Sequence, residues 1–340
     1  MKKFLLYIIA FITIIFIIPI VLTNNKNIKK EVSTNVMLPE EEYVKINNNE
    51  NEEIPESKNN TIKTIKLLKT KTGEIKEMNL NEYLYRVVSA EMPATFSIEA
   101  LKAQVIVART YTLYKSQGKQ HQNADICDSY NCCQAYISKE DRLAKWDENV
   151  RQYNWDKITY AVNSTENNII KYEGNPIAAF FHSNSGGTTE IPLNVWGGTG
   201  YPYLQAVTTS GEEGYSQYSS SVILNQQELL EKLKVKYKDI QINFENLEDI
   251  KVIEYTQGNR VKTIKFGNKN ISGVEIRTLL GLKSANFQIK KEGQNYVFYV
   301  LGYGHGVGMS QTGADSLAKQ GYDFKYIIHH FYKGVSISNF

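Results

Sequence analysis

The chain has 340 residues and a formal net charge of +3, and 42% of its residues are hydrophobic. This length is sufficient for two lobes, and so small a net charge gives no reason to expect a nucleic-acid partner. The 23 tyrosines would suit a carbohydrate surface, but tyrosine is also common in strands.

The N-terminus predicts attachment to a membrane. Residues 4–22 carry no charge and follow Lys2 and Lys3, and a stretch of this length can cross a hydrocarbon core of about 30 Å. Because no small-residue cleavage site follows, we expect residues 1–22 to be an uncleaved transmembrane anchor, with a signal peptide as the alternative. Residues 23–60 are rich in Asn, Lys and Glu and are expected to form a disordered linker.

The remaining residues, 61–340, mix hairpins and helices without regular βαβ alternation, which predicts an α+β fold. Alternation around turns predicts hairpins at 62–80, 169–182, 251–266 and 287–301. Helical spacing predicts helices over 80–91, from 98 to at least 112, over 153–166, 225–234 and 272–280, after 311 and after 323. Capping boxes would open two of them, at Asn79 with Glu82 and at Ser272 with Glu275. We expect two lobes around a cleft, with residues 61–207 and 295–340 forming the core and 208–294 the second lobe.

Glu91 stands out among the carboxylates. Apolar residues at 80, 84, 87 and 88 share one face of the first predicted helix, and Glu91 continues this face two positions before a proline. A buried carboxyl is expected to have a raised pKa, which makes it a usable general acid near neutral pH. A solvated glutamate at a frayed helix end is the other interpretation.

The three cysteines lie close together in a polar segment with one histidine. His121, Cys127 and Cys133 are spaced six residues apart, and imidazole and thiolate are preferred zinc ligands. A disulfide is the alternative in an extracytoplasmic chain, although it would leave one cysteine over. Cys132 competes with Cys133 for the third ligand position.

Two polar, glycine-rich segments are candidates for a ligand wall. Residues 302–311 (GYGHGVGMSQ) fit neither the dinucleotide nor the P-loop pattern. They predict either a hairpin-to-helix connector or a wall that presents His305, Ser310 and Gln311. In the second segment, 182–187 (HSNSGG), serine-hydrolase chemistry is disfavoured because the G-x-S-x-G elbow is absent.

Several separated blocks together resemble the stage II sporulation protein D family. They are residues 88–93 (VSAEMP), 99–104 (EALKAQ), 108–111 (ARTY), 182–187, 302–311 and 327–332 (IIHHFY). The predicted single anchor is also similar to that family, and the region from about 208 to 294 resembles it least.

The resemblance implies a lytic transglycosylase that cuts peptidoglycan glycan strands already stripped of stem peptides. Glu91 would act as both acid and base and would leave a 1,6-anhydro-N-acetylmuramic acid end. The resemblance further implies Zn²⁺ on His121, Cys127 and Cys133. It also implies a glycan site, formed by Arg109, Tyr111, His182, Ser185, His305 and Gln311.

The same resemblance implies a place of action. The ectodomain would lie outside the membrane, on the mother-cell side of the sporulation septum, and would act in engulfment with stage II sporulation proteins M and P. The alternative is a non-catalytic wall-binding or amidase-enhancing module, because related proteins carry the same domain as an activator.

Overall fold

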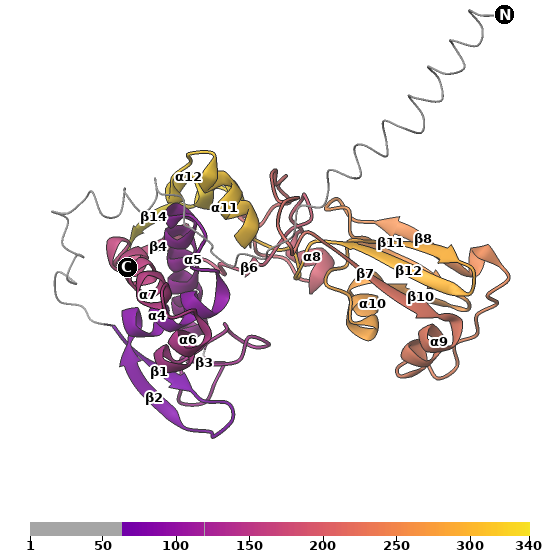
Figure 1. The fold of residues 1–340 in the computed structure, drawn as a ribbon, viewed down its shortest axis with the longest axis horizontal. Helices are drawn as coiled ribbons and strands as arrows, with labels where there is room; N and C mark the ends of the chain where they lie inside the picture. The colour runs from indigo at the N-terminus through magenta and orange to yellow at the C-terminus, as the bar shows by residue number, and fades with distance from the viewer. Residues whose placement is uncertain (1–62, 119) are drawn as a thin grey trace, which may run out of the picture. The chain divides into compact units, whose positions relative to one another are not determined.

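The computed structural model describes residues 63–118 and 120–340. The expected anchor at 1–22 and linker at 23–60 therefore lie outside the described residues. Within the described part, no helix is both long and apolar enough to cross a membrane. Helices are mixed with mainly antiparallel sheets (Figure 1), which confirms the α+β prediction.

The elements follow one another along the chain without a repeating unit. The helices are α4 (Leu80–Glu91), α5 (Ile98–Gln117), α6 (Lys139–Lys145), α7 (Arg151–Ser164), α8 (Pro192–Val195), α9 (Gln226–Lys234), α10 (Gly273–Leu280), α11 (Gln311–Lys319) and α12 (Phe324–Phe331). The strands are β1 (Thr64–Leu68), β2 (Ile75–Asn79), β3 (Ile126–Cys127), β4 (Asn168–Tyr172), β5 (Asn175–Pro176), β6 (Phe181–His182), β7 (Ser219–Asn225), β8 (Ile250–Tyr255), β9 (Val261–Phe266), β10 (Lys269–Ser272), β11 (Phe287–Glu292), β12 (Asn295–Leu301), β13 (Met309–Ser310) and β14 (Ser336–Asn339).

Local sequence signals set the start of α4. The side chain of Asn79 accepts hydrogen bonds from the backbone N–H groups of Asn81 and Glu82, as the predicted N-cap requires. The Glu82 carboxylate does not complete a capping box but accepts a hydrogen bond from Arg86 one turn later, at 2.5 Å. The start of this helix is thus confirmed, and the second half of its predicted cap is wrong.

Helix α5 is the centre of the first hydrophobic cluster. The sequence predicts one buried stripe on this helix, whereas residues 103 to 113 are all buried. The reason is that α4, α7, α11, α12 and β4 all pack against α5 (Figure 1), so it has no solvated face along this stretch. The cluster takes its members from residues 65–204 and 307–335.

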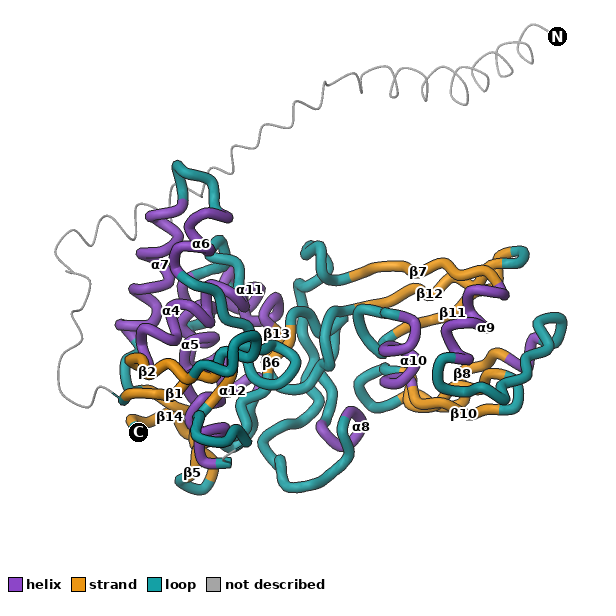
Figure 2. Tube along the Cα trace, turned by 90° about the horizontal axis from the view of Figure 1, so that it is seen from below, coloured by secondary structure: helices purple, strands orange, loops and turns teal. Residues whose placement is uncertain are grey.

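A second hydrophobic cluster takes its buried members from residues 224–300. Strands β8, β9 and β10 form one antiparallel sheet, and β7 adds to the β11–β12 hairpin to form another. Both predicted hairpins, 251–266 and 287–301, are confirmed. Helices α9 and α10 pack on these strands (Figure 2). The predicted boundaries of the two lobes stay a prediction.

The predicted hairpin at 169–182 is only half correct. Strand β4 pairs with the two-residue β5, but β6 pairs in parallel with β13, so that His182 lies opposite Ser310. Gly308, at φ +73°, permits this approach, because a Cβ there would lie 1.9 Å from the Phe180 carbonyl oxygen. The pairing brings the segments that follow 182 and 310 side by side, and these segments reach the candidate site.

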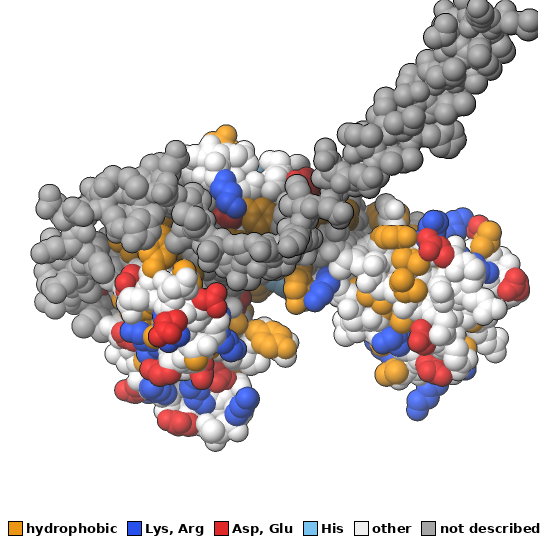
Figure 3. All heavy atoms as spheres, viewed as in Figure 1, with side chains coloured by type: hydrophobic (Ala, Val, Ile, Leu, Met, Phe, Trp, Pro, Cys, Tyr) orange, Lys and Arg blue, Asp and Glu red, His pale blue; other side chains and the backbone are white. Residues whose placement is uncertain are grey.

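Charges of both signs are mixed on the molecular surface. On the face shown in Figure 3, Lys and Arg side chains alternate with Asp and Glu side chains. Some form exposed ion pairs, such as Lys262 with Glu254 at 2.8 Å. Pairs of this kind contribute at most about 1 kcal/mol each, so the hydrophobic clusters carry most of the stability.

Candidate active site

Glu91 is the last residue of α4. Met92 follows it in an extended conformation, and Pro93 comes next, so the helix ends there. Leu84 and Val88, on the face that Glu91 continues, are fully buried. Helical phase therefore carries the Glu91 side chain inward rather than toward solvent.

The surroundings of Glu91 favour its neutral, protonated form. Burial raises the pKa of its carboxyl above the usual value, although hydrogen bonds from Ala135 and Gln311 act in the opposite direction. The Ala135 backbone N–H donates to Glu91 Oε1 at 2.5 Å. Glu91 is half-buried at the cavity, and these features favour an acid with a raised pKa over a solvated glutamate.

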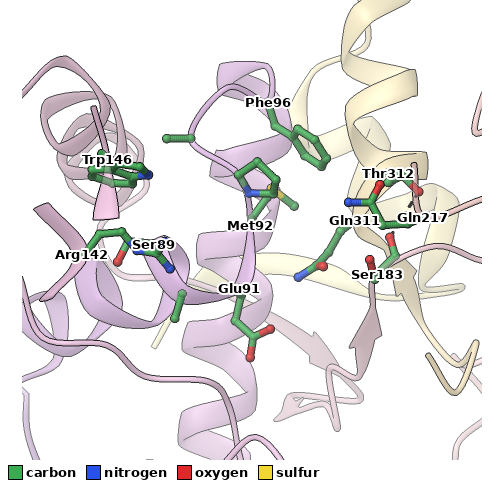
Figure 4. A pocket seen from close by; sticks show the side chains of 13 residues that line it. Ser89, Glu91, Met92, Phe96, Arg142, Trp146, Ser183, Gln217, Gln311 and Thr312 are labelled. Atoms are coloured by element: carbon green, nitrogen blue, oxygen red, sulfur yellow. Dashed lines mark hydrogen bonds between the residues drawn. The ribbon is translucent and has the colours of Figure 1, made fainter. Parts of the chain in front are cut away.

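Glu91 lines a cavity of about 360 Å³. Three parts of the chain form its wall: the end of α4 with the loop after it, helix α6 with its C-cap, and a group of residues from 183, 217 and the start of α11. In the view of Figure 4, Glu91 lies between the last two of these groups. The lining side chains include Ser89, Glu91, Met92, Phe96, Arg142, Trp146, Ser183, Gln217, Gln311 and Thr312.

Glu91 is the one carboxylate among the described residues that line this cavity. Two other glutamates nearby in the sequence are bound elsewhere. Glu82 pairs with Arg86, and Glu99 pairs with Lys102 at 2.8 Å. The site thus offers one proton donor and no second carboxylate to act as nucleophile or base.

Gln311 is the predicted glycan-site residue that lines the cavity with Glu91. Its Nε2 also donates to Gln104 Oε1 at 3.4 Å. The predicted HSNSGG segment reaches the cavity through Ser183, not through His182 or Ser185. The β6–β13 pairing explains why Ser183 and Gln311, which are far apart in the sequence, reach the same wall.

Arg109 does not line the Glu91 cavity, and its predicted place in the glycan site stays a prediction. Its side chain is fully buried, and its guanidinium donates to the carbonyl oxygens of Val162, Thr165 and Asn168 at 2.7–3.2 Å. These carbonyls lie at and just beyond the C-terminal end of α7, where a cation is favoured by the helix dipole. Arg109 is therefore a structural cap for α7.

Ser185 is also buried away from the cavity. Its hydroxyl donates to Glu212 Oε2 at 2.5 Å. Glu212 is fully buried and also accepts hydrogen bonds from the hydroxyls of Thr209, Ser310 and Thr312. Burial alone would raise the pKa of Glu212, but the hydrogen bonds from these hydroxyls lower it to about 2. Glu212 is therefore a buried anion that connects separate segments of the chain.

The two predicted histidines pack together outside the Glu91 cavity. The ring centroids of His182 and His305 are 5.7 Å apart. Burial lowers the pKa of His182 to about 4, and that of His305 well below its usual value. His182 Nδ1 donates to the Val307 carbonyl oxygen at 3.2 Å. Both rings are therefore neutral at pH 7, and their predicted glycan contacts stay a prediction.

Tyr111 lies near the cysteines rather than in the cavity. Burial, followed by the nearby Cys133, raises the pKa of its hydroxyl. Its ring packs on that of Phe180, with centroids 5.8 Å apart. Tyr111 does not line the Glu91 cavity, and its predicted glycan contact stays a prediction.

Arg142 and Trp146 line the cavity, but sequence reasoning missed them. The Arg142 guanidinium carbon lies 5.4 Å from the centre of the Trp146 ring. They stand four residues apart, so one helical turn places both on the same side of α6. That spacing was the available signal, but nothing in it indicates that α6 faces Glu91.

The His and Cys cluster forms a candidate metal centre. One donor atom each from His121, Cys127, Cys132 and Cys133 lies within 4.8 Å of the others. The sulfurs of Cys132 and Cys133 are 3.8 Å apart, and the His121 Nε2 is 3.3 Å from Cys133 Sγ. With Zn–S bonds of about 2.3 Å, tetrahedral geometry places two sulfurs roughly 3.8 Å apart. The donor set therefore fits zinc.

The thiols of this cluster would benefit from a cation. All three cysteines are free, so the cluster holds no disulfide. Burial raises the pKa of the Cys127 and Cys133 thiols, and the charge of Cys132 raises both further. Thiolates so close together repel one another unless a metal ion neutralises them.

Comparisons with known proteins agree with the motif blocks. A family model described as Stage II sporulation protein matches residues 68–172. The chain is 33% identical over 280 residues to stage II sporulation protein D of Bacillus amyloliquefaciens, covering 81% of this chain and 78% of the relative. It is 34% identical over 278 residues to stage II sporulation protein D of Bacillus subtilis (strain 168), covering 81% and 79%.

A more distant relative carries a different name. It is the amidase enhancer of Bacillus subtilis (strain 168), which is 29% identical over 303 residues, covering 75% of this chain and 40% of the relative. The two stage II sporulation protein D relatives are more than 30% identical to this chain, over most of its length and of theirs. This similarity confirms the resemblance seen in the motif blocks. This chain belongs to the stage II sporulation protein D family.

Proposed function

We propose that the protein is a peptidoglycan lytic transglycosylase that cleaves denuded glycan strands, with Glu91 as its catalytic residue. The observation that carries this proposal is the single carboxyl in the cavity, with its raised pKa. Most glycoside hydrolases need two carboxylates about 5–9.5 Å apart. A transglycosylase needs one, because the substrate supplies its own nucleophile.

The reaction balances with Glu91 alone. Its protonated carboxyl gives a proton to the glycosidic oxygen, and the bond from that oxygen to the muramoyl C1 breaks. The muramoyl C6 hydroxyl then bonds to C1 and returns its proton to Glu91. No water is consumed, and the products are a free 4-hydroxyl and a 1,6-anhydro end. The Ala135 N–H would orient the carboxyl through both steps.

We also propose that His121, Cys127, Cys132 and Cys133 together bind one Zn²⁺. Three protein ligands plus water would be typical of a catalytic zinc, whereas four protein donors leave no open position. When bound, the metal would cross-link the loop around the cysteines and take no part in bond breaking. Ala135, which holds Glu91, lies two residues beyond Cys133 in this loop.

The place of action is part of the same proposal. The uncharged stretch at 4–22 and the membership of a sporulation family support a single-pass anchor, with the ectodomain on the mother-cell side of the septum. Its partners there would be stage II sporulation proteins M and P. The glycan strand would bind in a cleft between two lobes, with the scissile bond at Glu91.

Mass spectrometry of the products from denuded peptidoglycan tests the activity. The purified full-length chain should release fragments with 1,6-anhydro ends, and Glu91→Gln should lower the rate by at least about 100-fold because it removes the proton donor. Glu82→Gln, on the exposed face of the same helix, is the matched control and should retain activity. Reducing ends in the products would instead indicate a hydrolase.

A non-catalytic, amidase-enhancing module is the second candidate. The relative named amidase enhancer favours it. In that case neither the wild type nor Glu91→Gln would release fragments from denuded strands, and both would stimulate a purified cell-wall amidase equally.

A further inference from the structure

The wall of the Glu91 cavity includes a cation without an anionic partner. Arg142 is half-buried on α6, and its Nε is buried with no hydrogen-bond partner in the described structure. No ion pair involves it among the described residues. Burial alone lowers its pKa, and no nearby carboxylate raises it again. A partly buried guanidinium without an anionic partner is unfavourable unless a ligand supplies the missing charge.

Position in the cavity separates Arg142 from a similar arginine. Arg151, at the start of α7, also has a buried Nε without a partner, but it does not line the cavity. An unpaired Nε therefore does not mark a binding site by itself. Arg142 shares the cavity with Glu91, and its guanidinium lies by the Trp146 ring, which restrains its orientation.

We propose that Arg142 binds the free lactyl carboxylate of N-acetylmuramic acid and thereby selects glycan strands from which stem peptides have been removed. This inference rests on the proposed function, because it names the specificity residue of that same cavity. Trp146, whose ring also lines the cavity, would pack on the apolar face of the same sugar.

The chemistry of the two kinds of strand explains the selection. Where a stem peptide is attached, the lactyl carbonyl is part of a neutral amide. Removal of the peptide leaves a carboxylate with one negative charge, which matches the planar fork of a guanidinium. A neutral amide would leave Arg142 uncompensated, so the site favours the charged strand. A hydrogen bond between charged groups of this kind contributes about 10–100-fold to binding.

Paired substrates test the proposal. One is denuded glycan with free lactyl carboxylates, and the other is the same glycan after carbodiimide coupling converts them to methylamides. For the full-length wild type, we expect kcat/KM to be about 10–100-fold higher on the carboxylate strand. In Arg142→Gln, the ratio of kcat/KM on the carboxylate strand to kcat/KM on the methylamide strand should fall toward one. Arg142→Lys should retain part of the preference for the carboxylate strand. The matched control Arg151→Gln should keep the wild-type ratio.

Equal turnover of both substrates by the wild type, or an unchanged ratio in Arg142→Gln, would overturn the proposal. Circular dichroism and thermal unfolding of each variant identify those that fail to fold. If the wild type cleaves neither strand, the transglycosylase proposal fails, and calorimetry with Glu91→Gln decides the inference separately. The inference is supported if Glu91→Gln binds the carboxylate strand more tightly than the methylamide strand, and if adding Arg142→Gln removes this difference. Equal binding of the two strands, or no binding of either, rejects the inference.

Discussion

The chemistry at Glu91 depends on competing effects on one carboxyl. Burial favours the protonated form, whereas hydrogen bonds from Ala135 and Gln311 favour the charged form, and burial is the larger effect. Its pKa in the folded chain is therefore higher than in the unfolded chain. It follows that the carboxyl is a better proton donor near neutral pH and that its ionisation opposes folding.

We predict that Glu91→Gln makes the protein at least as stable as the wild type at pH 7. In the wild type, the stability linked to Glu91 is fully present below its unfolded pKa and is lost as the pH rises through the folded pKa. Glutamine carries no charge, and its amide oxygen can still accept the Ala135 N–H. Denaturant unfolding of both proteins from pH 4 to pH 8 should show their difference growing in favour of glutamine. A Glu91→Gln protein that is markedly less stable at pH 7 would contradict the raised pKa.

The loop between α5 and α6 positions Glu91 through one backbone group. Strand β3 pairs in parallel with β1 and thereby places Cys127 in the sheet. The chain then returns through Cys132 and Cys133 to Ala135, whose N–H meets Glu91. Apart from β3, the described residues of this loop form little regular structure, so a metal ion bound to its four donors would restrain it.

Removal of the metal tests whether zinc restrains the loop between α5 and α6. Elemental analysis of the purified protein should give about one zinc per chain, and a chelator should remove it. A metal present at 100 times its dissociation constant stabilises a fold by about 2.7 kcal/mol, so the unfolding temperature should fall after removal. Far-ultraviolet circular dichroism should change little, because α4, α5 and α7 lie outside the loop.

Cys132→Ser provides the sharpest version of the metal test. It should weaken zinc binding if Cys132 is a fourth ligand, and it should leave binding unchanged if His121, Cys127 and Cys133 suffice with a water. A fully active protein without metal, with a disulfide between two of the cysteines, would reject the ligand set.

At the scale of the whole molecule, two buried charges connect distant segments. Glu212 accepts hydrogen bonds from Ser185, Ser310 and Thr312, which lie in or just beyond the paired strands β6 and β13. Arg260, from the strand β9 region, donates to the carbonyl oxygens of Ser185 and Thr188 at 2.9 and 2.8 Å. These contacts hold the segments that carry Ser183 and Gln311 to the cavity.

The lowered pKa of Glu212 predicts loss of stability in acid. Its contribution is present above the unfolded pKa of about 4.3 and is lost as the pH falls toward its folded pKa of about 2. A shift of this size corresponds to about 3 kcal/mol. Glu212→Gln should be less stable than the wild type at pH 7 by about 2–4 kcal/mol and should show a flatter acid limb in denaturant unfolding. Glu213→Gln, at the exposed neighbouring position, should behave as the wild type.

Much of the local structure could be predicted from the sequence because its causes are local. Periodicity and the Asn79 cap predicted α4, and helical phase predicted that Glu91 continues a buried face. The spacing of His121 and the cysteines predicted a cluster, and the motif blocks predicted the family. The motif blocks did not predict that Arg109, Ser185 and the two histidines lie outside the Glu91 cavity, because a motif does not encode the direction in which a side chain points.

The sequence by itself determined the α+β class, the ends of α4 and the inward direction of Glu91, since neighbours within about one helical turn set these features. Only the tertiary structure decided what surrounds Glu91. Packing of α6 brings Arg142 and Trp146 to the cavity, and the β6–β13 pairing brings Ser183 and Gln311. These residues are separated by 51 to 220 positions from Glu91. Contacts at that distance depend on how whole elements pack, which no local pattern encodes.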